Sequence, residues 1–263
     1  MPDQMQFFSG LRDRDLAREG LVIAEGRLVV ERLLAAGAFE VLEVCCVPAL
    51  ETGIRALAAG RCGVRILAEP ELAALAGYPF HRGVLAVARR PASPTIPGFV
   101  AGLPLDAAAP LLLLPATGDP ENLGALLRSA AAFGFHGVLA GRDTADHLSR
   151  RVLRVSMGAS LATRFLRLGG PSDLERFREI GYRLVSAVLD ADADDLEGWE
   201  PARRTILSLG EEYGGLGPEW LDGSDQKVTI GMASGPDSLN VAAAGAILMR
   251  HLAHRLASGI AKG

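Results

Sequence analysis

Lysine, asparagine and cysteine are scarce in this chain of 263 residues. The three cysteines, Cys45, Cys46 and Cys62, are odd in number and have no CxxC spacing, so the sequence predicts neither a disulfide framework nor a zinc site. No apolar run approaches the ~20 residues that span a bilayer, and the amino-terminal stretch lacks the basic and apolar segments of a signal peptide. We therefore expect a cytoplasmic protein that binds no membrane and no metal.

The formal net charge of −4 argues against a nucleic-acid partner, but the charges are unevenly distributed. Between residues 142 and 183, nine arginines stand against five acidic residues, whereas between 190 and 225 eleven acidic residues stand against two arginines. A basic stripe in the first stretch would neutralise phosphates, and arginines on solvated helix faces would give the same composition. Both interpretations stay open.

Periodicity in the first ninety residues indicates a small α/β unit. The stretch 24–37 predicts a helix with one apolar side, formed by Leu28, Val29, Leu33 and Leu34. Short apolar runs that predict strands follow at 41–47, 63–67 and 83–88. Five prolines then occur between residues 91 and 110, and they predict an interdomain linker without regular structure.

The second half of the chain alternates strands and helices on a larger scale. The helical stretches lie between most of the strands, and a long helix closes the chain at about residues 239–256. Such alternation predicts an α/β fold with a mostly parallel sheet covered on both faces, and ligands bind such sheets beyond the carboxyl ends of the strands. The loops after residues 115, 189, 210 and 231 are therefore the candidate sites. The predicted strands are 111–115, 137–140, 163–168, 182–189, 205–210 and 227–231.

The first of these loops, TGDPENLGALLR, contains one of the only two asparagines in the chain, Asn122. Asp119 and Pro120 fit the cap and first turn of a helix, which would place Asn122 and Arg128 near its opening. Six residues correspond to about 600° of helical rotation, so the two side chains share a site only if the first turn bends. The other interpretation is a capped helix whose arginine pairs with an acid.

The second loop, LSLGEEYGGLGPEW, has four glycines between residues 210 and 217. Glycine permits close approach of the backbone to a ligand. The loop has neither the P-loop pattern nor GxGxxG, and Glu211 and Glu212 would repel an anion. It fits a neutral or cationic ligand, or a plain glycine turn.

The third loop, TIGMASGPDSLNV, leads into the last helix, which we expect to begin near Ser238. Ser238 or Asp237 would cap that helix, and Asn240 would project from its first turn. The chain contains no HExxH and no GxSxG, and His251 and His254 are expected at the surface or an interface.

Taken together, NLGALLRSAAAFG, GEEYGGL and IGMASGPDSLNV resemble the three motifs of the SpoU, or TrmH-like, branch of the SPOUT RNA methyltransferases. The resemblance covers the whole chain, because EGRLVVERLLAAG and YPFHRGVLAVARRP are similar to the amino-terminal domain of many members. It implies an L7Ae/L30e-like α/β domain at residues 1–95 that binds the RNA substrate, the proline-rich linker at 96–110, and a SPOUT domain with a deep trefoil knot at 111–263.

The resemblance also implies an activity, namely methyl transfer from S-adenosylmethionine to a ribose 2′-hydroxyl of ribosomal or transfer RNA by a homodimer that forms through the knotted domain. An arginine side chain stays protonated in proteins and is therefore a poor general base, so we expect Arg128 to stabilise the forming alkoxide electrostatically. The implied catalytic positions are Asn122, Arg128, Glu212, Ser238 and Asn240. The implied cofactor-binding positions are Leu209, Gly210, Ile230, Met232 and Leu239.

Three residues depart from the family's pattern: Glu211 replaces the commoner asparagine, Tyr213 a glycine and Gly231 a proline. An alternative reading is therefore a non-catalytic RNA-binding relative whose cofactor loop is spoiled by Tyr213 and Gly231. A nicotinamide-dependent oxidoreductase is a further alternative, although the glycine fingerprint after its first strand is missing.

Overall fold

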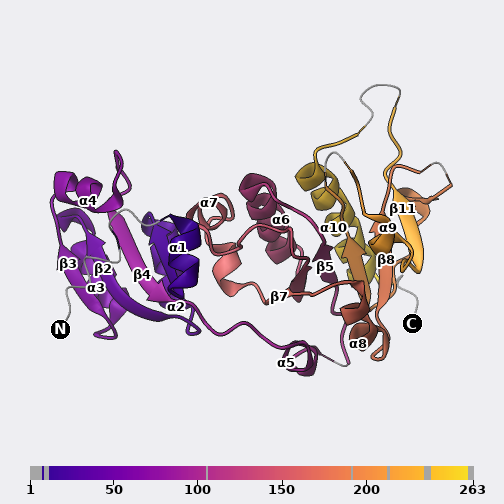
Figure 1. Ribbon diagram of the computed structural model, residues 1–263, viewed down its shortest axis with the longest axis horizontal. Coiled ribbons are helices and arrows are strands. Elements are labelled where there is room, and N and C mark those ends of the chain that lie inside the picture. Colours follow the sequence, from indigo (N-terminus) through magenta and orange to yellow (C-terminus); the bar gives the residue numbers. More distant parts are fainter. Residues whose placement is uncertain are drawn as a thin grey trace. The chain divides into compact units, whose positions relative to one another are not determined.

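The computed structural model describes Phe8 and residues 12–104, 106–190, 192–211, 214–233 and 238–259. The chain forms two compact units, coloured along the sequence in Figure 1. Unit 1 comprises Met1–Ala92 and Asp146–Ala162, and unit 2 comprises Ser93–Ala145 and Thr163–Gly263. The segment Asp146–Ala162 therefore lies between two parts of unit 2 in the sequence but packs within unit 1.

Unit 1 contains a four-stranded sheet in the order β1-β4-β2-β3. Strand β4 is antiparallel to both β1 and β2, and β2 is parallel to β3. The three strand runs that we predicted form β2, β3 and β4. The strands are β1 (Leu21–Glu25), β2 (Glu40–Cys46), β3 (Gly63–Ile66) and β4 (Val84–Arg89).

Both faces of this sheet are buried, because successive residues of β1 alternate between two apolar clusters. Val22 packs with α2 and α3 on one face, and Ile23 packs with α1 and α4 on the other. Segment 146–162 contributes Leu153 to the first cluster. The helices are α1 (Asp13–Arg18), α2 (Arg27–Ala35), α3 (Glu51–Ala58), α4 (Glu69–Ala76) and α7 (Arg150–Val155), with 3₁₀ turns η2 (Pro48–Leu50) and η3 (Ala159–Ala162).

The helix predicted at 24–37 is shorter than expected. Its first residues belong to β1, and Gly26, with φ 86°, separates that strand from α2. The predicted apolar side also needs one correction, because Leu28 is exposed and Val30 is buried in its place.

Several arginines of the basic stretch at 142–183 hold the backbone and do not form a free stripe. Arg164 donates to the carbonyl oxygens of Phe99 and Gly102, and Arg167 donates to those of Gly141 and Thr144. These two arginines therefore belong neither to a free basic stripe nor to a solvated helix face.

The proline-rich stretch contains a helix, α5 (Ile96–Ala101), so the prediction that it has no regular structure is wrong. Thr95 caps the helix by accepting a hydrogen bond from the N–H of Gly98. Pro97 lies in the first turn, where a missing N–H donor costs nothing. Phe99 is buried in the core of unit 2, which explains why this helix forms beside the prolines.

Unit 2 contains a seven-stranded sheet in the order β7-β6-β5-β10-β8-β11-β9. All of its strand pairs are parallel, which confirms the prediction of an α/β fold with a mostly parallel sheet. All six predicted strand runs form strands, and the two-residue edge strand β9 was not predicted. The strands are β5 (Leu111–Leu114), β6 (Gly137–Ala140), β7 (Phe165–Arg167), β8 (Arg183–Ala187), β9 (Asp194–Asp195), β10 (Thr205–Ser208) and β11 (Gln226–Thr229).

Late strands are inserted between early ones in this sheet. Strand β10 lies between β5 and β8, and β11 lies between β8 and β9. Because the chain passes directly from β8 to β9, the segment that joins them must cross β11.

Helices cover both faces of the sheet of unit 2 (Figure 1). Helices α6 and α10 pack against each other, and a side chain at Gly245 of α10 would collide with Leu126 of α6 and Leu209. The helices α5, α8 and α9 contribute to an apolar cluster of unit 2 through Phe99, Phe177 and Trp220, respectively. The remaining elements of unit 2 are α5, α6 (Pro120–Ala132), α8 (Glu175–Arg178), α9 (Pro218–Leu221) and α10 (Val241–Ala257), with turns η4 (Pro171–Leu174) and η5 (Leu196–Gly198).

Candidate functional site

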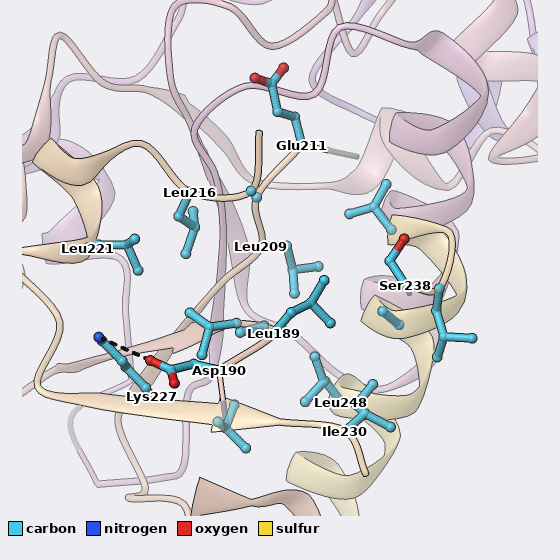
Figure 2. Close-up of a pocket in the computed structure, with 18 of the residues that line it drawn as sticks. Leu189, Asp190, Leu209, Glu211, Leu216, Leu221, Lys227, Ile230, Ser238 and Leu248 are labelled. Carbon is cyan, nitrogen blue, oxygen red and sulfur yellow. Dashed lines mark ion pairs between the residues drawn. The ribbon is translucent and has the colours of Figure 1, made fainter. Parts of the chain in front are cut away.

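A cavity of about 700 Å³ lies at the carboxyl ends of β8, β10 and β11. This volume is within the range of small-molecule sites. Its walls come from the loops after those three strands and from the first half of α10, and half of the labelled side chains in it are leucines (Figure 2). Three of the four loops that the sequence singled out therefore meet at one cavity.

The five residues expected at cofactor-binding positions all line this cavity. Leu209 and Gly210 follow β10, Ile230 and Met232 follow β11, and Leu239 precedes α10. The structure thus brings together residues that are up to 30 positions apart in the sequence.

The backbone of the glycine loop is closed tightly at Gly210. A Cβ atom at this position would lie 2.2 Å from the carbonyl carbon of Gly215, closer than any side chain tolerates. Glu211 and Gly215 exchange two backbone hydrogen bonds of 3.0 Å, which hold the loop in this form. Glycine is therefore required at 210 by close backbone approach, and the loop is a defined wall of the cavity.

Asn240 is the N-cap of α10, so our expectation that Ser238 or Asp237 caps this helix and that Asn240 projects from its first turn is wrong. Its Oδ1 accepts hydrogen bonds from the N–H groups of Ala242 at 2.9 Å and Ala243 at 3.3 Å. Asparagine is favoured at an N-cap, which removes the puzzle of a poor helix former in a helical turn. Asp237 itself lies outside the described residues.

The two asparagines of the chain are in contact. Asn240 Nδ2 donates to Asn122 Oδ1 at 3.0 Å, and Asn122 is buried in the first turn of α6. Asp119 caps α6 by accepting from the N–H of Glu121 at 2.9 Å, as the sequence predicted. The loop after β5 therefore joins the third loop through an amide pair.

Arg128 lies on a different side of α6 from Asn122. The helix runs without a break through both residues; Asn122 is buried, whereas Arg128 is exposed and forms no hydrogen bond or ion pair with any described residue. Within one chain the first turn does not bend to bring them together.

Ser238 lines the cavity near the start of α10. Of the other residues singled out in these loops, Glu212 and Tyr213 lie outside the described part of the chain, and Glu211 lines the cavity. At Gly231 a Cβ atom would lie 2.9 Å from Asp195 Oδ2, so a larger residue here requires that carboxylate to move.

Two charged residues of the cavity, Asp190 and Lys227, were not predicted from the sequence. Their side chains form an ion pair, with Lys227 Nζ 3.8 Å from Asp190 Oδ2 (Figure 2). Asp190 follows a predicted strand in one of the four candidate loops, and Lys227 is one of only two lysines beside 25 arginines. The loop position of Asp190 and the scarcity of lysine could therefore have pointed to these two residues from the sequence.

No group of three or more potential metal ligands occurs in the part of the chain that the structure describes, and none of its helices has the length and apolar character needed to cross a membrane.

Comparison with known proteins identifies the family. Residues 110–250 match the SpoU rRNA Methylase family. An uncharacterized tRNA/rRNA methyltransferase of Mycobacterium bovis is 36% identical over 234 residues, which are 87% of this chain and 79% of the relative. The 23S rRNA (guanosine-2′-O-)-methyltransferase RlmB of Nitrosomonas europaea is 33% identical over 202 residues, 74% of this chain and 76% of the relative.

A solved structure supports the same grouping. The SpoU methyltransferase AviRb of Streptomyces viridochromogenes, in complex with the cofactor AdoMet, has a TM-score of 0.81 and 25% identity, with 97% of this chain and 98% of that chain covered. The chain belongs to the SpoU rRNA methylase family. This membership disfavours the nicotinamide-dependent oxidoreductase.

Proposed function

We propose that this protein is an RNA methyltransferase that transfers a methyl group from S-adenosylmethionine to a ribose 2′-hydroxyl of ribosomal or transfer RNA. The observation that carries the proposal is the cavity at the carboxyl ends of β8, β10 and β11, lined by the residues at the family's cofactor positions. The similarity to the 23S rRNA (guanosine-2′-O-)-methyltransferase RlmB and to the AdoMet complex of AviRb supports the same reaction and cofactor. Such an enzyme works where its RNA is, in the cytoplasm.

The residues of the cavity fit the proposed cofactor. Leu209, Leu216 and Leu248 provide an apolar surface for an adenine ring, and the close backbone at Gly210 leaves main-chain groups within reach of the adenosine. Glu211, which also lines the cavity, is compatible with a ligand that carries a positive sulfonium. When bound, S-adenosylmethionine supplies an electrophilic methyl group.

The chain's own residues would position the acceptor and stabilise charge. Asn122 and Asn240 form a fixed amide pair beside the cavity wall, and Ser238 presents a hydroxyl on the same side. We assign Arg128 the electrostatic stabilisation of the ribose alkoxide as its proton leaves, with Glu212 and Asn122 orienting the guanidinium. Holding the hydroxyl in line with the methyl group would contribute to the rate by orienting the two reactants.

A homodimer would complete this site. Arg128 is exposed on α6, on a different side from Asn122, so a second copy is needed to bring the guanidinium of one chain to the asparagine pair of the other. Ile247 of the adjacent helix α10 is 43% exposed, which offers apolar surface for such an interface.

A deep trefoil knot in unit 2 is supported by the strand order. Strands β10 and β11 are each inserted between strands that precede them in the sequence, and the segment joining β8 to β9 crosses β11. A knot forms when a late segment of the chain passes through the loop made by an earlier connection. Knots of this kind are exceptions to the rule that protein chains are not knotted.

Unit 1 is the part of the protein that we assign to RNA selection, as an L7Ae/L30e-like domain. In composition unit 1 has 14 arginines against 12 acidic residues, whereas unit 2 has 13 basic and 19 acidic residues. A net charge of +2 in unit 1 beside −6 in unit 2 favours contact between phosphates and unit 1. The assignment covers residues 1–95, together with segment 146–162, which packs within the same unit.

The second candidate function is an RNA-binding relative without catalysis, favoured by Tyr213 and Gly231 in the cofactor loops. Calorimetric titration of the purified protein with S-adenosylmethionine distinguishes the methyltransferase from the binding-only relative. We expect saturable binding of one cofactor per site. A folded protein that releases no heat with S-adenosylmethionine or S-adenosylhomocysteine would support the binding-only relative.

A further inference from the structure

The Asp190–Lys227 ion pair is the feature of the cavity that the proposed chemistry does not use. Among the described residues that line the cavity, three are charged, Asp190, Glu211 and Lys227, and Lys227 is the single cation. The lysine and aspartate side chains are 48% and 44% exposed, so solvent reaches both. A ligand that enters the cavity can therefore contact the pair without unfolding anything.

The topology of unit 2 builds this pair. Lys227 is the second residue of β11, and β8 and β9 lie on either side of that strand. Asp190 lies on the segment that passes from β8 across β11 to β9, which brings its carboxylate to the ammonium of Lys227. Strand order thus places Asp190 and Lys227 close together, although they are 37 positions apart in the sequence.

The cavity is polar at its two ends and apolar between them. In Figure 2 the Asp190–Lys227 pair lies at the opposite side of the cavity from Ser238, and Leu189 and Leu209 lie between them. Glu211 extends away from these leucines. One end therefore offers the hydroxyl of Ser238, and the other offers two opposite charges.

The two arms of S-adenosylmethionine differ in the same way. The adenosine arm is neutral and largely flat, and it fits the leucines and the glycine backbone. The amino-acid arm ends in an α-ammonium and an α-carboxylate, and charge-assisted hydrogen bonds to ionised partners are the strong ones. A cation is a strong partner for a carboxylate, and Lys227 is the single described cation of the cavity.

We propose that Lys227 binds the α-carboxylate and Asp190 the α-ammonium of the amino-acid end of S-adenosylmethionine. This inference rests on the proposed function, because it assigns a role within the cofactor site. The two side chains neutralise each other before the ligand arrives and exchange that contact for two contacts with the ligand's own opposite charges. Neither residue belongs to the three motifs through which the sequence resembles its family.

A matched pair of ligands tests the inference, because S-adenosylhomocysteine and 5′-methylthioadenosine share the adenosine and the sulfur and differ in the amino-acid end. Calorimetry with the full-length protein gives both dissociation constants. We expect Lys227→Met to weaken S-adenosylhomocysteine about tenfold, roughly 1.4 kcal/mol, and to leave 5′-methylthioadenosine within about twofold. Asp190→Asn should act in the same direction, and Lys227→Arg should retain most of the affinity.

Unchanged binding of 5′-methylthioadenosine also shows that each variant is folded, and Arg176→Met, which removes an exposed cation paired with Glu179, controls for net charge. Equal weakening of both ligands by Lys227→Met would overturn the inference, because the pair would then contact the adenosine. Unchanged binding of both ligands would overturn it as well. Wild-type protein that binds neither ligand would instead contradict the proposed function itself.

Discussion

Asn240 Nδ2 donates a hydrogen bond of 3.0 Å to Asn122 Oδ1, across 118 residues of sequence. These are the only asparagines in the chain. The same Asn240 side chain accepts two backbone N–H groups of α10 through Oδ1, so both ends of its amide are engaged. One residue thus caps a helix and fixes the start of α10 to the start of α6.

Two substitutions of Asn240 distinguish its hydrogen bond to Asn122, here called the bridge, from its role as the N-cap of α10. Asn240→Ala removes both and should lower the free energy of unfolding by about 1–2 kcal/mol, whereas Asn240→Ser keeps a capping oxygen and should recover most of that loss. Both variants should be impaired in methyl transfer, since neither holds Asn122. Denaturant unfolding and initial rates measure the two effects. Full activity of Asn240→Ser would remove any catalytic role for the bridge.

Arg128 should act on turnover and not on cofactor affinity. Arg128→Ala is expected to lower the methyl-transfer rate by ~100-fold or more, the cost of losing one group that stabilises a transition-state charge. The dissociation constant of S-adenosylmethionine should stay nearly unchanged, because Arg128 does not line the cavity. Arg176→Ala, which removes another exposed arginine, serves as control. Loss of both rate and affinity would contradict the role assigned to Arg128.

Gly210→Ala should damage the cofactor loop. A Cβ atom at 210 would lie 2.2 Å from the carbonyl carbon of Gly215, so the loop must open, at a cost of about 1–3 kcal/mol, and cofactor affinity should fall with it. Gly198→Ala is the matched control, because nothing lies within 4 Å of a Cβ there. Comparable binding by the two variants in calorimetry would show that the tight backbone at Gly210 is not needed.

The ion pair between Arg90 and Asp146 should make the stability of unit 1 sensitive to acid. Arg90 Nη1 and Nη2 lie 2.9 and 2.7 Å from the two carboxylate oxygens of Asp146. Burial by itself would raise the pKa of Asp146, but the hydrogen bonds and charge of Arg90 outweigh it and hold the pKa below its usual value. Folding therefore favours the ionised carboxylate.

A carboxylate whose pKa is lowered by folding stabilises the protein above its unfolded pKa, ~3.9, and loses that contribution as the pH falls through the folded value. Asp146→Asn should accordingly cost about 1.5 kcal/mol at pH 7, with the difference from wild type shrinking below pH ~3.9. Glu40→Gln, which affects an exposed pair with Arg89, should cost less than ~0.5 kcal/mol. A wild-type advantage that persists unchanged in acid would contradict this account.

The sequence predicted best where patterns are local. Apolar runs identified six of the seven strands of unit 2, and the second and third loops supplied the five predicted cofactor-binding residues that line the cavity. Its failures came from tertiary context. The core of unit 2 recruits Phe99 and so forms a helix among prolines, and segment 146–162 packs with strands that lie far away in the sequence. Strand order, which brings Asp190 to Lys227, leaves no trace in composition or spacing.

The most direct test of the central claim is transfer of labelled methyl from S-adenosylmethionine to total RNA from a strain that lacks this gene, followed by alkaline digestion. A methylated ribose 2′-hydroxyl blocks cleavage of the adjacent phosphodiester, so we predict label in alkali-resistant dinucleotides derived from ribosomal or transfer RNA. Label released entirely in mononucleotides would place the methyl group on a base and contradict the ribose reaction. No transfer by folded, cofactor-binding protein to this undermethylated RNA would contradict the methyltransferase assignment.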